Sequence, residues 1–157
     1  MRLNIDKIIK SRRKEFILVI SQFIIIALHF IKINLFNQKI IQGEFLIINY
    51  ISNFLIILAL IFIIFSVKSL GKSLSAMPRP KENSTLITIG IYSIIRHPMY
   101  YSLIIISFSL FIKSFTIYNF ILSILLTFII SNKIKIEEEY LLKKFNKYTS
   151  YKKEVKI

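Results

Sequence analysis

An apolar run of 34 residues, from Pro98 to Ser131, most limits the folds open to this chain. One helix of that length would measure about 51 Å, whereas the hydrocarbon core of a bilayer is about 30 Å thick. The run is interrupted only at Lys113 and Ser114 and by scattered Ser, Thr and Asn residues. It therefore predicts either one overlong helix or a helical hairpin that turns near Lys113.

The distribution of positive charge favours the hairpin. The chain of 157 residues is 55% hydrophobic and carries a net charge of +14, as in an integral membrane protein with basic loops. A hairpin returns the lysine-rich tail, residues 133–157, to the side of the N-terminus and of the loop at 68–97, as the positive-inside rule requires. Both termini are then cytoplasmic, and a nucleic-acid partner is not expected. Only three of the 22 Lys and Arg residues fall outside: Lys32, Lys39 and Lys113.

Four transmembrane spans are expected in all. The first is Phe16 to Phe36. Its basic start and apolar run resemble a signal peptide, but no small-residue cleavage site follows, so we interpret it as a span that is not cleaved off. A polar loop at 37–44 leads to the second span, Phe45 to Val67. The hairpin supplies the other two, and its first arm, Met99 to Ile112, is short for a full crossing.

The predicted fold class is therefore all-α: an integral membrane helical bundle forming a single domain over residues 1–157. Residues 1–67 are its two-span N-terminal region, and residues 68–157 hold the loop, the hairpin and a C-terminal helix. That helix is expected over 133–148 and outside the membrane, because four apolar residues fall on one stripe of it. They are Ile134, Leu141, Phe145 and Tyr148.

Polar residues inside the first two spans need partners. His29 is expected to pack against or hydrogen-bond to a neighbouring helix, and Asn49, Ser52 and Asn53 are expected at helix–helix contacts. The chain has no cysteine, which excludes disulfides and cysteine-ligated metal. Its two histidines lie far apart in the sequence, so no metal site is expected.

The segment from Gly90 to Tyr100 carries the strongest candidate site. Pro98 suits the first turn of the helix that enters the membrane, so Arg96 and His97 stand at a helix N-terminus, where an anionic ligand group is favoured. Three of the eight acidic residues cluster at 137–139, which the hairpin returns to the same face. The two groups together suit a ligand that carries both charges.

These residues resemble the isoprenylcysteine carboxyl methyltransferase family and its phospholipid methyltransferase relatives. The first motif, G-x-Y-x-x-x-R-H-P-x-Y, begins at Gly90, and the second, E-E-x-x-L-x-x-x-F-x-x-x-x-x-Y, begins at Glu137. L-I-T-I-G before the first motif and L-G-K-S-L at 70–74 are also similar to the family. The resemblance covers roughly residues 70–155.

The resemblance implies an integral membrane enzyme that uses S-adenosylmethionine, with 68–157 as its catalytic half. Arg96, His97 and Glu138 are the implied catalytic group, in which Arg96 and Glu138 support the site. Lys133 stands where the family has an arginine associated with substrate. The positive charge is kept, but a lysine cannot donate the two parallel hydrogen bonds of a guanidinium. The implied cofactor-binding residues are Leu86, Ile87, Tyr92, His97, Pro98, Met99, Tyr100 and Glu137.

The apolar spans favour a lipophilic methyl acceptor: an isoprenylcysteine-like carboxylate, a phospholipid amine or a small apolar metabolite. A carboxylate needs no general base, whereas for an amine or thiol His97 or Glu138 could take the proton. Two other classes stay open. An NADPH-dependent membrane reductase similar to sterol reductases shares the R-H-x-x-Y stretch at Arg96 but lacks the glutamate pair. A non-enzymatic membrane or lipid-binding protein would bind no cofactor.

Overall fold

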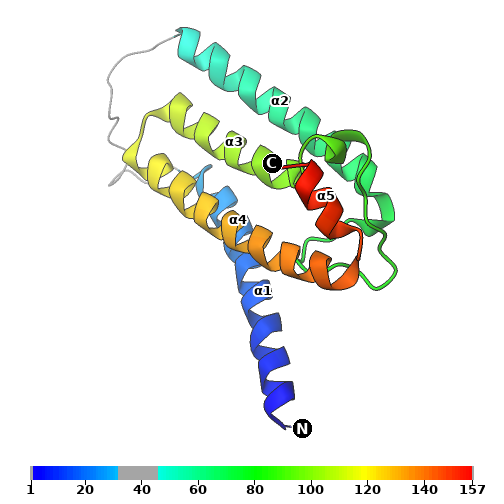
Figure 1. Ribbon diagram of the computed structural model, residues 1–157. Coiled ribbons are helices and arrows are strands. Elements are labelled where there is room, and N and C mark those ends of the chain that lie inside the picture. The colour runs from blue at the N-terminus through cyan, green and yellow to red at the C-terminus, as the bar shows by residue number, and fades with distance from the viewer. Residues whose placement is uncertain (1, 32–45, 157) are drawn as a thin grey trace.

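The structure is a computed structural model that describes residues 2–31 and 46–156, and the all-α class is confirmed for this part of the chain (Figure 1). Two short 3-10 turns, η2 (Gly71–Ser73) and η3 (Gly90–Ser93), lie in the long segment between the second and third helices. The α-helices are α1 (Arg2–Leu28), α2 (Leu46–Leu70), α3 (Pro98–Ser114), α4 (Ile117–Lys144) and α5 (Tyr148–Glu154).

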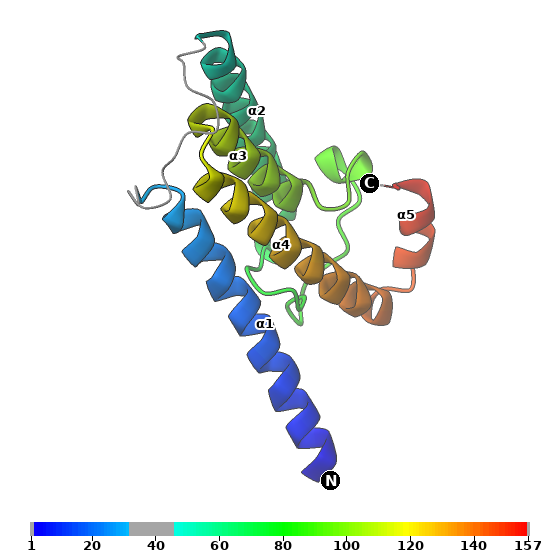
Figure 2. The same cartoon turned by 90° about the vertical axis from the view of Figure 1, so that its left-hand side faces the viewer.

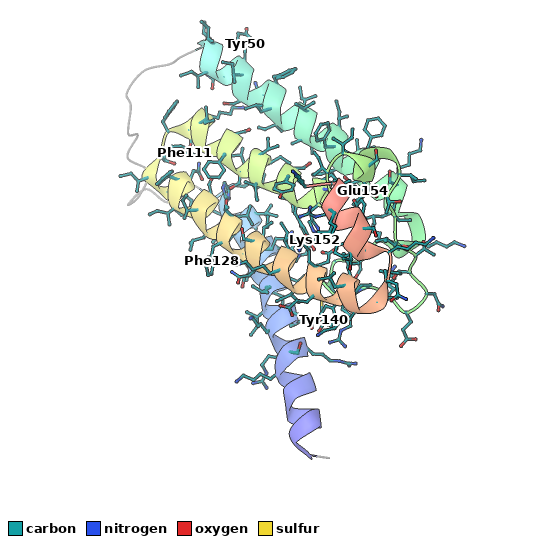
Figure 3. All side chains as sticks on the ribbon, in the orientation of Figure 1. Tyr50, Phe111, Phe128, Tyr140, Lys152 and Glu154 are labelled. Carbon is teal, nitrogen blue, oxygen red and sulfur yellow. The ribbon has the colours of Figure 1, made fainter. Side chains whose placement is uncertain are left out.

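The long helices pack side by side in the order α2, α3, α4, α1. Figure 2 shows that α1 runs along α4 and that its N-terminal end reaches beyond the rest of the bundle. The short α5 lies at the C-terminal end of α4, close to the 71–97 segment (Figure 1). In Figure 3, Tyr50 and Phe111 mark one end of the bundle, and Tyr140 and Lys152 mark the opposite end.

Small residues form the contact face of α2 and recur in α3. Ser52, Ala59 and Ser66 follow one another at seven-residue spacing on α2 and are fully buried, and α3 buries Ser102 and Ser109 at the same spacing. Each of these serines donates its hydroxyl to a carbonyl four residues earlier in its own helix. Small side chains that satisfy their own polar groups allow two helix backbones to approach closely.

Two of the predicted helix–helix contacts in α2 are confirmed. Ser52 is buried in the bundle, and Asn53 accepts a hydrogen bond of 3.0 Å on its Oδ1 from Nζ of Lys113 on α3. The predicted role of His29 is also confirmed. Its Nε2 lies 2.9 Å from Oγ of Ser107 on α3, and Ser107 in turn bonds Ser123 on α4.

The hairpin predicted near Lys113 is confirmed between α3 and α4. Phe115 ends α3 in the left-handed conformation (φ 47°, ψ 37°), and Thr116 caps α4 by accepting a hydrogen bond from the Asn119 amide. Pro98 is in the first turn of α3, as the sequence indicates. With 17 residues α3 measures about 25 Å, which is short for a bilayer core of about 30 Å.

Two predicted helix boundaries are wrong. The first span was expected to end at Phe36, but α1 ends at Leu28, and it already begins at Arg2 in the basic N-terminal stretch. A separate helix over 133–148 was also expected, but α4 is continuous as far as Lys144 because its sequence contains no Gly or Pro to break it. The predicted loop at 37–44 lies outside the described residues.

The predicted single stripe along 133–148 is therefore wrong as well. Ile134 packs against the core between α1, α3 and α4, around Leu126 and Ile130. The other three residues of the stripe, Leu141, Phe145 and Tyr148, pack in a second cluster with Leu86. This happens because α4 ends before Phe145 and α5 begins at Tyr148.

Two of the described helices are long and apolar enough to cross a membrane: α2 together with η2, over Leu46–Ser73, and α4. Their most apolar stretches have a mean hydropathy of 2.6 and 1.6, respectively. Both expose large apolar side chains, such as Phe54 and Ile64 on α2 and Phe128 on α4, which suits contact with lipid. Four crossings and cytoplasmic termini stay predictions.

Candidate active site

A cavity lies where the 70–100 segment meets the C-terminal part of α4 and the start of α5. The empty space in it measures about 750 Å³, which includes open solvent at its mouth. The first turn of α3 forms one wall with His97, Met99 and Tyr100. Glu137 and Leu141 of α4 face it, so the hairpin brings the two sequence motifs to one site.

Glu137 and Tyr100 connect α4 to α3 inside this cavity. The Tyr100 hydroxyl donates a hydrogen bond of 2.7 Å to Oε2 of Glu137. The Tyr100 ring stacks on His97, with ring centroids 5.8 Å apart and an interplanar angle of 25°. A carboxylate held by a buried phenol is oriented before any ligand arrives, which favours recognition of a cationic group.

Glu138 lies one residue further along α4 and is surrounded by Arg96, His97 and Lys152. Its Oε1 accepts from Arg96 Nε at 3.1 Å and lies 3.3 Å from His97 Nε2, and its Oε2 accepts from Lys152 Nζ at 2.6 Å. Arg96 also donates through Nη1 to the carbonyl of Val155. Glu138 itself does not line the cavity, and it fixes the Arg96–His97 pair from behind.

The tyrosines of α5 close the C-terminal wall. Tyr151 donates a hydrogen bond of 2.5 Å to the carbonyl of Tyr92, which ties α5 to η3. Tyr148 is almost fully buried and lines the cavity, and its hydroxyl has no protein partner among the described residues. Burial raises the pKa of the Tyr92 and Tyr148 hydroxyls above their usual range, so both are neutral donors at physiological pH.

Lys133 lies behind the first wall of the cavity. Its Nζ donates a hydrogen bond of 2.5 Å to Oε1 of Gln22 on α1 and stands 5.0 Å from the centroid of the Tyr100 ring. Its side chain is buried and does not line the cavity. Lys133 therefore supports the Tyr100–Glu137 pair through a cation–π contact.

A second polar cluster connects α1 to the cavity wall. Oε1 of the buried Glu15 accepts from the Tyr140 hydroxyl at 2.5 Å, from Arg79 Nη2 at 3.2 Å and from Ser11 Oγ at 3.1 Å. Arg79 lines the cavity and also donates to the Tyr140 hydroxyl at 2.8 Å. Nothing in the sequence around Glu15 indicated this contact, because an isolated acid in a basic stretch usually lies in solvent.

Most of the residues assigned to the cofactor by resemblance lie together. Leu86, Ile87, Tyr92, His97, Met99, Tyr100 and Glu137 all line the cavity, as does Arg96. Three assigned residues do not line it: Pro98 is fully buried at the start of α3, and Glu138 and Lys133 contact lining residues from outside. Within the described residues, no group of three or more His, Asp and Glu side chains is placed to hold a metal ion.

A helical hairpin with an acid and a histidine facing one cavity, beside helices fit to cross a membrane, is an arrangement suited to a membrane enzyme. The chain belongs to the phospholipid methyltransferase family, whose model matches residues 47–148, well over half of its length. No curated protein and no solved structure matches the chain. The family implies methyltransferase activity and membrane association, and its methyltransferases generally use S-adenosylmethionine.

Proposed function

We propose that this protein is a membrane methyltransferase that transfers a methyl group from S-adenosylmethionine to a lipophilic acceptor. The single observation that carries the proposal is the pairing of Glu137 with Tyr100 across the cavity, next to the N-terminus of α3. This arrangement offers a carboxylate to a cation and the positive end of the α3 dipole to an anion, within one cavity.

The polar groups of the cavity fit the charges of the cofactor. Glu137 would hold its amine or ribose hydroxyls, and the α3 N-terminus with His97 would hold its carboxylate. Tyr92, Leu86 and Ile87 would enclose its apolar and aromatic parts. When bound, the cofactor supplies an electrophilic methyl group on a sulfonium sulfur, and the transfer leaves S-adenosylhomocysteine.

The contribution of the chain to such a transfer is mainly positioning, which can lower a barrier by about 7–11 kcal/mol. Tyr100 keeps Glu137 in one orientation, and Glu138 does the same for Arg96 and His97. We assign Glu138 as a positioning residue because it does not line the cavity. For an amine acceptor, His97 would take the released proton on Nδ1, since Nε2 faces Glu138.

The apolar surface of α2 and α4 supports a lipophilic acceptor. Large side chains such as Phe54 and Phe128 are mostly exposed, so a lipid can lie along these helices while its reactive end reaches the cavity. Lys133 is the residue we assign to the acceptor side, acting through Tyr100 rather than by facing the cavity.

A methyl-transfer assay tests the proposal. The protein is placed in nanodiscs with methyl-labelled S-adenosylmethionine and either phosphatidylethanolamine or a farnesylated cysteine carboxylate. We expect label in an organic-soluble product, lost in Glu137→Gln and retained in Glu139→Gln, whose side chain is exposed. The absence of a labelled product, together with binding of NADPH in place of S-adenosylhomocysteine, would instead indicate a reductase.

A further inference from the structure

We propose that Arg79 recognises an anionic group of the acceptor, a singly charged phosphate or carboxylate next to an apolar chain. This inference rests on the proposed function and adds a specificity-determining residue to it. Arg79 lies in the cavity wall formed by the 75–80 segment, outside the two sequence motifs.

Arg79 is held in place by only one of its three nitrogens. Nη2 donates to Oε1 of Glu15 and to the hydroxyl of Tyr140, and the guanidinium lies 5.0 Å from the centroid of the Tyr140 ring. Pro78 and Pro80 on either side restrict the backbone. The side chain is therefore fixed in direction, while its other N–H groups have no partner among the described residues.

The unused donors include one that is buried. Nε of Arg79 is inaccessible to solvent and has no protein partner in the described parts of the chain. Buried donors are nearly always satisfied in native proteins, and each exception needs a reason, such as strain, a catalytic role or a bound water or ion. Since the guanidinium carries five N–H groups and the Arg79 side chain is 37% exposed, Nη1 can donate to an oxygen of an anion in the cavity.

The other cations around the cavity are already engaged. Arg96 donates to Glu138 and to the Val155 carbonyl, and the imidazole of His97 faces Glu138. Lys133 donates to Gln22. Glu15 offsets part of the charge of Arg79 but occupies only Nη2. Arg79 is thus the cation of this wall that is best placed to hold a further anion.

The position of Arg79 assigns this anion to the acceptor rather than to the cofactor. Its partner Tyr140 follows Glu137 by three residues on α4, so Arg79 lies about one helical turn beyond the carboxylate proposed for the cofactor. The cofactor carboxylate has its own place at the α3 N-terminus. An acceptor anchored at Arg79 would lie beside the cofactor and along α4.

Equilibrium binding to matched pairs of probes tests the inference. The full chain, saturated with S-adenosylhomocysteine, is titrated with dioctanoyl phosphatidylmethanol, whose phosphate diester carries one negative charge, and with dioctanoylglycerol, which lacks the phosphate. A second pair is S-farnesylthioacetate and its methyl ester, which differ by one carboxylate charge. We expect the wild type to bind at least one anionic probe about tenfold more tightly than its neutral counterpart. The pair that shows the preference identifies the source as phosphate or carboxylate.

Arg79→Gln is expected to reduce this preference to about one while changing the affinity for S-adenosylhomocysteine by less than about threefold. Lys143→Gln is the matched control, because it removes one exposed positive charge from the end of α4 without touching the cavity, and it should keep the preference. The Glu15→Gln, Tyr140→Phe double variant removes the counter-charge and the phenol hydroxyl that contact Nη2 but retains the guanidinium, and it should also keep most of the preference.

Three results would overturn the inference. The first is an unchanged preference in Arg79→Gln, and the second is an equal loss of S-adenosylhomocysteine affinity, which would assign Arg79 to the cofactor. The third is complete loss of the preference in the double variant, which would show that the guanidinium alone does not bind the anion. Failure of the wild type to bind S-adenosylhomocysteine would contradict the proposed function instead, so the two failures are distinguishable.

Discussion

The hydroxyl of Tyr100 donates a hydrogen bond of 2.7 Å to Oε2 of Glu137 across the cavity between α3 and α4. This bond joins the two sequence motifs, which are separated by 36 intervening residues of the hairpin. Tyr100 also contacts His97 on one side and Lys133 on the other. The pair is therefore the centre of the proposed cofactor site, and substitutions at Tyr100 test whether the orientation of Glu137 matters.

Tyr100→Phe removes the hydrogen bond and keeps the ring that packs on His97. We expect the affinity for S-adenosylhomocysteine to fall about three- to tenfold, because Glu137 loses its neutral donor and can rotate. Tyr101→Phe is the matched control, since Tyr101 does not line the cavity and should bind as the wild type does. Isothermal calorimetry in detergent measures both, and an unaffected Tyr100→Phe would show that the orientation of Glu137 is unimportant.

Glu138→Gln should mainly lower stability. Its carboxylate is 13% exposed and contacts Arg96, His97 and Lys152, so neutralising it leaves Arg96 and Lys152 without their counter-charge. We expect a loss of about 2 kcal/mol in unfolding free energy, measured by denaturant titration in detergent. Glu139→Gln, on the exposed side of the same helix turn, should cost less than about 0.5 kcal/mol. Equal effects of the two substitutions would contradict the role assigned to Glu138.

Ala59→Leu should disrupt the contact of α2 with its neighbours. Ala59 is completely buried between Ser52 and Ser66 on the small-residue face, so extra methyl groups force the helices apart, at a cost of about 1–3 kcal/mol. Ile57→Phe adds volume on the exposed side of α2 and should be almost neutral. Thermal unfolding in the same detergent compares them, and a stable Ala59→Leu would show that this face is not tightly packed.

Alkaline pH should destabilise the C-terminal wall. Burial raises the pKa of Tyr148 in the folded state above its unfolded value of about 10. The stability gained by keeping the phenol neutral is thus fully present below about pH 10 and is lost as pH rises toward the folded pKa, by about 1.4 kcal/mol per pH unit. Tyr148→Phe should show a shallower loss of stability between pH 10 and 11 than the wild type, and identical slopes would count against this burial effect.

The sequence predicted that the two motifs lie together, because the features that bring them together are local and strong. Pro98 sets the start of α3, the apolar run forces a hairpin, and the turn at Phe115 returns Glu137 to the level of His97. Those constraints bring the two motifs together without knowledge of the side-chain packing. The partner of His29 could be predicted for a similar reason, since a polar ring at the end of an apolar helix requires a neighbouring helix as partner.

The contribution of α1 could not be predicted from the sequence. Glu15 and Gln22 stand on one face of α1, but single polar residues in a mixed helix carry no periodic signal that identifies their partners. Their partners, Tyr140 and Lys133, are more than 100 residues away. The end of α4 at Phe145 could not be predicted either, because neither Gly nor Pro marks it. It depends on the packing of Phe145 and Tyr148 with Leu86.

Calorimetric titration of the purified protein with S-adenosylhomocysteine, alongside a Glu137→Ala, His97→Ala double variant, tests the central claim most directly. We predict saturable binding by the wild type with a stoichiometry near one, and no measurable binding by a double variant that remains folded. A folded wild type that binds no S-adenosylhomocysteine, with and without a lipid acceptor present, would contradict the proposed function.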